Sequence, residues 1–176
     1  MRAAIDSRQK VTIMKRIKLL VAVGVGILGG SAAFAQNTDL YSYHEGQLDV
    51  AGFYASRDKD GRNTDTWGMG VGMNYFFCKY VGVGADTYFD AWEVPYLLNG
   101  DGYFRYPIMH TGIAPYAFGG GGRQWTHAAQ WLAHAGVGIE YRVHPEAGIF
   151  FDARQVFPDH TKNYAVLRLG FRFAFQ

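Results

Sequence analysis

The sequence WGMGVGMNYFF, residues 67–77, alternates large apolar side chains with glycine at almost every step. A period of two residues is typical of an extended strand, whose successive side chains point to opposite faces. One face of this strand is apolar along its whole length, and the other face is mostly glycine. A sandwich strand hides its apolar face against a second sheet, whereas a membrane barrel strand turns that face to lipid and its small or polar face to the lumen.

The same alternation recurs along the chain, and this recurrence favours the barrel. We predict strands at residues 47–55, 66–77, 80–91, 102–109, 114–123, 131–143, 147–156 and 164–175. Their lengths are those that a tilted strand needs to cross a bilayer. Long links (56–65, 92–101, 157–163) alternate with short ones (78–79, 110–113, 144–146), and link 124–130 is intermediate. The predicted fold is all-β, an eight-stranded antiparallel up-and-down transmembrane barrel over residues 47–176.

The first 35 residues have the pattern of a cleavable secretory signal peptide. A basic stretch, residues 14–18, precedes an apolar run, and Ala33-Phe34-Ala35 supplies the small residues of a cleavage site before Gln36. An uncleaved anchoring helix is the alternative, and residues 1–13 either extend the leader or precede a true start at Met14. Residues 36–46 would then form a periplasmic N-terminal segment.

Removal of this leader changes the charge balance of the chain. It takes six of the 17 Lys and Arg and one of the 15 Asp and Glu, so the mature chain has 11 basic and 14 acidic side chains, a net charge of −3. No basic patch remains to indicate a nucleic-acid partner.

The polar faces of the predicted strands carry acids and bases in comparable numbers. We predict that they form a structural charge network in the lumen: Asp86, Asp90, Arg105, Arg123, His134, Glu140, Arg142, Asp152, Arg154, Arg168 and Arg172. Buried charges persist only when they are paired, so this interpretation predicts a plugged barrel. A narrow channel for water or small ions is the alternative.

Aromatic residues gather near both ends of the predicted strands, as in the two interfacial belts of membrane barrels. The predicted girdles comprise Trp67, Trp92, Trp125, Trp131, Tyr75, Phe77, Tyr80, Tyr106, Tyr116, Tyr141, Phe173 and Phe175. In strand 114–123, Tyr116 and Phe118 are expected on the lipid face.

Nothing in the sequence predicts catalysis or a cofactor. The mature chain has two serines, Ser42 and Ser56, and a partnership of Ser56 with His127 or His160 at the rim is the one weak candidate for a nucleophile and base. The histidines are scattered, with no spacing typical of a metal site. Cys78 is the single cysteine, so no internal disulfide is possible.

Two segments resemble the small eight-stranded outer-membrane barrels, the OmpA-type transmembrane domain and OmpX among them. The first is APYAFGGGG, residues 114–122, and the second is LRLGFRFAF, residues 167–175, which is similar to the terminal signal read by the barrel assembly machinery. Gln176 departs from this signal, because an aromatic residue usually ends the chain. The resemblance implies a bacterial outer-membrane location, contact with outer-membrane lipid and insertion by that machinery, with a monomeric barrel and an external partner that the sequence does not identify.

The sequence therefore predicts a non-enzymatic outer-membrane barrel that stabilises the envelope and presents its long loops outside. Three alternatives stay open: a small channel, a lipid A-modifying barrel enzyme, and a soluble secreted ligand-binding barrel.

Overall fold

The computed structural model describes residues 40–56, 58–59, 62–63, 65–90, 97–125 and 129–175, which belong to one compact unit, Asn37–Gln176. The predicted signal peptide lies outside the described residues. So do Trp92, His127 and the side chain of Asp90. Among the described residues, no helix is both long and apolar enough to cross a membrane.

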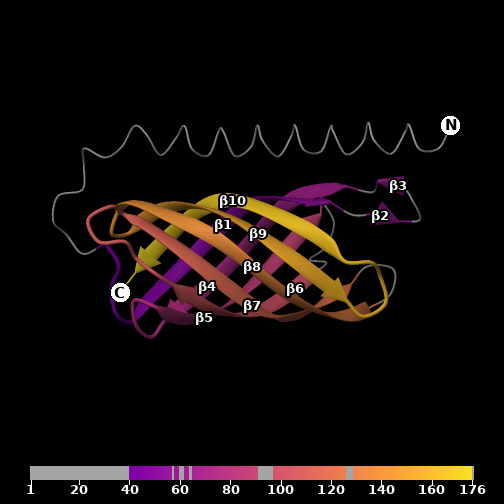
Figure 1. Ribbon diagram of the computed structural model, residues 1–176, viewed down its shortest axis with the longest axis horizontal. Coiled ribbons are helices and arrows are strands. Elements are labelled where there is room, and N and C mark those ends of the chain that lie inside the picture. The colour runs from indigo at the N-terminus through magenta and orange to yellow at the C-terminus, as the bar shows by residue number, and fades with distance from the viewer. Residues whose placement is uncertain are drawn as a thin grey trace. The chain divides into compact units, whose positions relative to one another are not determined.

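Eight strands form a closed antiparallel barrel (Figure 1). They are β1 (Glu45–Ser56), β4 (Thr66–Phe76), β5 (Val81–Asp90), β6 (Leu97–Arg105), β7 (Ile113–Trp125), β8 (Ala129–His144), β9 (Ala147–Pro158) and β10 (Tyr164–Phe175). A two-stranded hairpin, β2 (Asp58–Lys59) and β3 (Arg62–Asn63), lies in the link between β1 and β4. Each barrel strand pairs with its neighbours in the sequence, and β1 pairs with both β4 and β10 to close the cylinder. The predicted eight-stranded up-and-down barrel is confirmed.

Seven of the eight strands begin and end within two residues of the predicted positions, and the fourth does not. The predicted strand 102–109 is wrong, because β6 already begins at Leu97. Residues 99–102, Asn-Gly-Asp-Gly, have the composition of a turn. In the barrel they form regular strand pairs instead, with Asn99 and Asp101 buried and Gly100 and Gly102 exposed.

The outer wall is apolar because each strand turns alternate side chains outward. Along β4 and β8 these outward residues include Met69, Met73 and Val137, all more than 60% exposed. The opposite positions of the same strands hold glycines, amides and charged groups inside the barrel. This polarity is the reverse of a water-soluble protein, in which apolar side chains face inward.

Strand β7 has the opposite orientation from the predicted one. Tyr116 and Phe118 are each 5% exposed and lie in the lumen, whereas Arg123 is exposed on the outer wall. A change of one residue in the assignment of a strand's faces moves every side chain to the other side. The glycines of β8 explain the direction: Gly138 and Gly136 pair with Tyr116 and Phe118, and a Cβ on either glycine would meet the ring of its partner.

Candidate functional site

The barrel interior is the most highly charged part of the described structure. Among the described residues, six carboxylates and five guanidinium groups are buried there: Glu45, Asp49, Asp86, Asp101, Glu140, Asp152, Arg105, Arg142, Arg154, Arg168 and Arg172. They come from six of the eight strands, so the network joins walls that are distant in sequence.

One group of charges, the basal cluster, lies toward the end of the barrel where the chain enters β1. Glu45 is its centre: its Oε1 accepts from Nη1 of Arg105 at 3.0 Å and from Nη2 of Arg142 at 2.6 Å. Nε of Arg142 also donates to Glu140 at 2.6 Å. Both carboxylates therefore have cationic partners, and Gln47 donates a further hydrogen bond to Glu45 at 2.6 Å.

Arg172 extends the basal cluster across the lumen. Its Nε and Nη2 donate to the two oxygens of Asp49, each at 2.7 Å, in the bidentate geometry that makes Arg–carboxylate pairs strong. Its remaining Nη1 reaches Glu140 at 2.7 Å. Asn74 supplies Asp49 with another donor at 2.8 Å.

A second group, the central cluster, consists of Asp86, Asp152, Arg154 and Arg168. Arg168 holds Asp152 by two bonds of 2.7 Å and reaches Asp86 at 2.9 Å. Arg154 donates to Asp86 at 2.6 Å. The hydroxyl of Tyr116 donates to Asp152 at 2.7 Å, so the inward orientation of β7 contributes a partner to this cluster.

Beyond the central cluster, His134 is in contact with Asp101. Both side chains are buried, and Nη2 of Arg154 lies 3.9 Å from the second oxygen of Asp101. This pair connects β8 with β6 above the central cluster.

Aromatic rings lie against the guanidinium groups of the lumen arginines. Phe150 is 1% exposed, and its ring centre lies 4.6 Å from the guanidinium carbon of Arg172 and 5.6 Å from that of Arg168. Phe76, Tyr103, Tyr116 and Phe118 form one buried cluster on the facing wall. Cation–π contacts of this kind are stronger when they are shielded from water.

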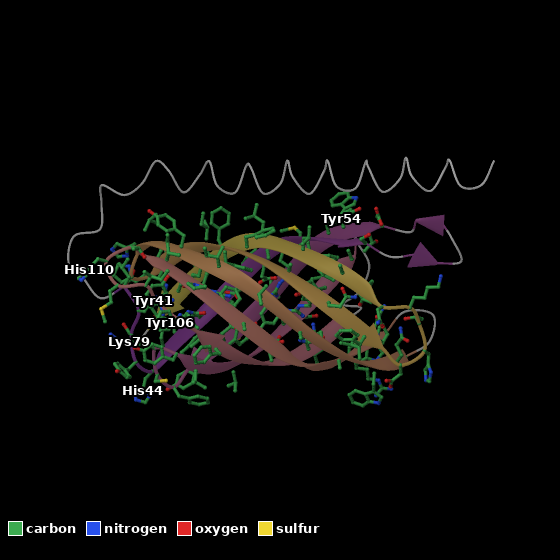
Figure 2. The ribbon with its side chains drawn as sticks, viewed as in Figure 1. Tyr41, His44, Tyr54, Lys79, Tyr106 and His110 are labelled. Atoms are coloured by element: carbon green, nitrogen blue, oxygen red, sulfur yellow. The ribbon has the colours of Figure 1, made fainter. Side chains whose placement is uncertain are left out.

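Tyr41 closes the basal end. Its hydroxyl donates to the carbonyl oxygen of Gly112 at 2.8 Å, and its ring lies 4.7 Å from the guanidinium carbon of Arg105 and 4.4 Å from that of Arg142. Figure 2 places Tyr41 at the end of the barrel that also carries Lys79 and His110. Burial raises the pKa of Tyr41 well above its usual value, so the phenol stays protonated and keeps its donor.

Apolar side chains are buried toward the opposite end of the barrel. A buried cluster joins six barrel strands there: Phe53, Ala55, Tyr88, Leu97, Leu132, Val156, Tyr164 and Val166. An interior cavity beside Asp49, Asp86 and Arg168 has a volume of about 10 Å³, room for about one water molecule. Charged, polar and aromatic side chains of the described residues are thus buried along the barrel interior.

Most of the predicted lumen residues lie together in this interior. They are Asp86, Arg105, His134, Glu140, Arg142, Asp152, Arg154, Arg168 and Arg172. The prediction that Arg123 lies in the lumen is wrong: its side chain is outside, because β7 turns its odd-numbered residues outward. Asp90 belongs to β5, but its side chain is outside the described residues.

Sequence reasoning missed three acids of the network. Glu45 precedes the predicted start of the first strand, and Asp101 is the last residue of the predicted link 92–101. Asp49 alternates with Leu48 and Val50 and could have been found from that pattern.

Most of the predicted girdle residues lie on the outer wall. Eight predicted members are exposed on the outside: Trp67, Trp125, Trp131, Tyr75, Tyr80, Tyr106, Phe173 and Phe175. Phe77 is exposed in the turn after β4, and Tyr141 is partly exposed. The prediction that Tyr116 is a girdle residue is wrong, because its side chain is buried in the lumen.

The two serines of the mature chain, Ser42 and Ser56, both lie at or near the ends of β1. Ser56 is exposed at the end of β1, and the structure describes no hydrogen bond from its hydroxyl to His160. The backbone N–H of Ser42 donates to Glu45, a member of the basal cluster. No three His, Cys, Asp or Glu side chains among the described residues are grouped as metal ligands, and Cys78 is a free thiol.

The barrel was compared with known proteins. No protein-family model and no curated protein matches the sequence. Among solved structures, the N-terminal β-barrel domain of Pseudomonas aeruginosa OprF is similar, with a TM-score of 0.58 and 17% identity over 76% of this chain and 99% of that one. The fold is that of the small eight-stranded outer-membrane β-barrels.

Two further outer-membrane barrels agree with this assignment. Neisserial surface protein A (NspA) has a TM-score of 0.56 and 14% identity, covering 74% of this chain and 96% of that one. Ail, the attachment invasion locus protein of Yersinia pestis, has a TM-score of 0.54 and 15% identity, covering 76% and 99%. At such identities the likeness to these outer-membrane barrels is a likeness of fold.

Proposed function

We propose that this chain is an exported bacterial outer-membrane barrel with a plugged lumen, which serves as a rigid support and presents its long loops for surface interactions. The observation that carries the proposal is the inverted polarity of the barrel. Apolar side chains cover the outer wall, while the basal and central clusters occupy the inside. A bilayer stabilises such a wall, whereas water does not.

The lengths of the links support one orientation. Links 77–80, 106–112 and 145–146 join β4 to β5, β6 to β7 and β8 to β9 at the end that holds Tyr41 (Figures 1 and 2). The longest link, residues 57–65 with the β2–β3 hairpin, lies at the other end. Outer-membrane barrels have short periplasmic turns and longer outer loops. We therefore place Tyr41 on the periplasmic side and the hairpin outside.

The membrane placement is tested with spin labels on a Cys78→Ser background. Labels at Val71, Val137 and Leu169, all exposed on the wall, should be relaxed by oxygen dissolved in lipid. A control label at Lys162, in the turn before β10, should respond to a water-soluble nickel reagent instead. Shielding of the three wall labels from both reagents would indicate a soluble particle and refute the placement.

The plugged lumen is tested by conductance in planar bilayers. The paired arginines, the buried rings and the small cavity beside Asp49, Asp86 and Arg168 support this part of the proposal. The reconstituted protein should show no reproducible open level. A steady, narrow conductance step would support the alternative function, a channel for water or small ions.

The role that we propose is non-catalytic. Its support is that Ser56 is exposed at the end of β1, with no hydrogen bond to His160 among the described residues. Lipid A from cells that overexpress the protein should have unchanged acylation, and a change that Ser56→Ala abolishes would establish an enzyme.

A further inference from the structure

Arg123 is the one Lys, Arg, Asp or Glu whose described side chain faces outward from the eight barrel strands. It lies two residues before the end of β7, beside the link to β8. The cost of placing an arginine on the lipid face is several kcal/mol at the bilayer midplane, and it falls to ~0–1 kcal/mol near the interface. Its position at the end of the strand therefore puts the charge where lipid headgroups begin.

Two tryptophans flank this charge. The guanidinium carbon lies 5.4 Å from the ring centre of Trp131 and 5.9 Å from that of Trp125. Trp131 is the cross-strand partner of Arg123, and Trp125 is the next outward residue on β7. Tryptophan side chains prefer the headgroup level, so both rings indicate the same depth as the arginine.

The guanidinium group has no anionic partner among the residues that the structure describes. No described residue accepts a hydrogen bond or forms an ion pair with Arg123, whereas each buried arginine of the lumen contacts at least one carboxylate. Its other cross-strand partner is Leu98, an exposed apolar residue. A planar group with five donors, adjacent to two rings and without a partner, is suited to a phosphate.

We propose that Arg123, Trp125 and Trp131 form a binding site for the phosphate of an anionic lipid in the outer leaflet. The guanidinium donates to phosphate oxygens, and the indole rings lie beside the first part of the acyl chains. The inference rests on the membrane placement proposed above and adds a specific lipid contact to it.

The test uses the full mature chain in a Trp67→Phe/Trp92→Phe background, which leaves Trp125 and Trp131 as fluorescent reporters. The protein is reconstituted in mixed phosphatidylcholine–phosphatidylglycerol vesicles in which one lipid or the other carries brominated acyl chains. Bromine quenches tryptophan only at short range. Brominated phosphatidylglycerol should quench with an apparent preference of about fivefold, the effect of one arginine near an anionic headgroup.

Three variants separate a site from a general charge effect. Arg123→Gln should reduce the preference to about one, and Arg123→Lys should retain most of it. The double variant Arg123→Gln/Gln155→Arg keeps the net charge but moves it to an outward position of β9 that has no tryptophan beside it. It should also lose the preference. High salt should weaken the preference of the unsubstituted protein, a measurement that needs no variant to fold.

Each contrary result has a distinct meaning. A preference unchanged in Arg123→Gln, retained in the double variant, absent from the starting protein or insensitive to salt would overturn the lipid site, while the membrane placement would stand. The absence of quenching by either brominated lipid would overturn the membrane placement and this site together.

Discussion

The central cluster offers the sharpest test of whether the lumen network stabilises the barrel. Substitution of Arg168 by methionine removes the two 2.7 Å bonds to Asp152 and the 2.9 Å bond to Asp86. Asp86 keeps Arg154 at 2.6 Å and Asn99 at 2.7 Å. Asp152, which is fully buried, keeps only the hydroxyl of Tyr116 as a partner among the described side chains.

The expected cost follows from these contacts. One buried carboxylate loses its cation while the other remains paired, and breaking a single buried ion pair costs about 3–5 kcal/mol. We expect Arg168→Met to lower the free energy of unfolding by this amount. Adding Asp152→Asn removes the uncompensated charge, so the double variant should recover about 2–3 kcal/mol of the loss.

The assay is denaturant unfolding of the protein in phospholipid vesicles, followed by tryptophan fluorescence. Leu169→Met is a matched control, because Leu169 is the next residue of β10, points outward and is 63% exposed; its effect should lie within about 0.5 kcal/mol. The reasoning fails if Arg168→Met is within about 1 kcal/mol of the unsubstituted protein, or if the double variant is no more stable than the single one.

Three further substitutions test other parts of the barrel. Tyr41→Phe removes the hydrogen bond to Gly112 and should lower the free energy of unfolding by about 1 kcal/mol in the same assay. Because folding raises the pKa of Tyr41, its hydroxyl contributes fully to stability below pH 10 and contributes less above it. The free energies of unfolding of the two proteins should therefore converge as the pH rises above 10. Gly120→Ala places a Cβ against the backbone of Gly100 and should lower the folded fraction on an unheated gel, whereas Gly100→Ala, with no heavy atom within 4 Å of its Cβ, should fold normally. Phe150→Ala should lower the free energy of unfolding by about 3–5 kcal/mol, and a loss below about 1 kcal/mol would show that the lumen collapses around the gap.

The strands could be predicted from the sequence because the two faces of a lipid-exposed strand have opposite chemistry. The alternation of Trp67, Met69, Val71 and Met73 with small residues appears directly in the sequence, and β4 begins at its predicted residue. Where the alternating side chains are small, the signal weakens. Gly100 and Gly102 are outward residues of β6 and have no side chain, so the sequence of this part of the strand has the composition of a loop.

The membership of the charge network could be predicted, but its pairing could not. Arg142 pairs with Glu45 across 97 positions of sequence, and Arg172 with Asp49 across 123. Which side chains meet across a barrel depends on its closure and on the stagger of its strands, and neither is encoded within one strand. The composition therefore indicates that the charges are balanced, whereas the closed cylinder decides which partners they have.

Strand β7 shows that packing between neighbouring strands can override the preference of a single one. Taken alone, Tyr116 and Phe118 match a lipid-facing pattern, since aromatic side chains suit a membrane wall. Beside β8, however, the same rings cover Gly138 and Gly136, where the lumen would otherwise hold a void. Filling that space turns Tyr116 toward Asp152 and, by the alternation of the strand, turns Arg123 outward. The inward orientation of Tyr116 thus supplies a donor to the central cluster, and it leaves Arg123 exposed on the outer wall near the end of β7.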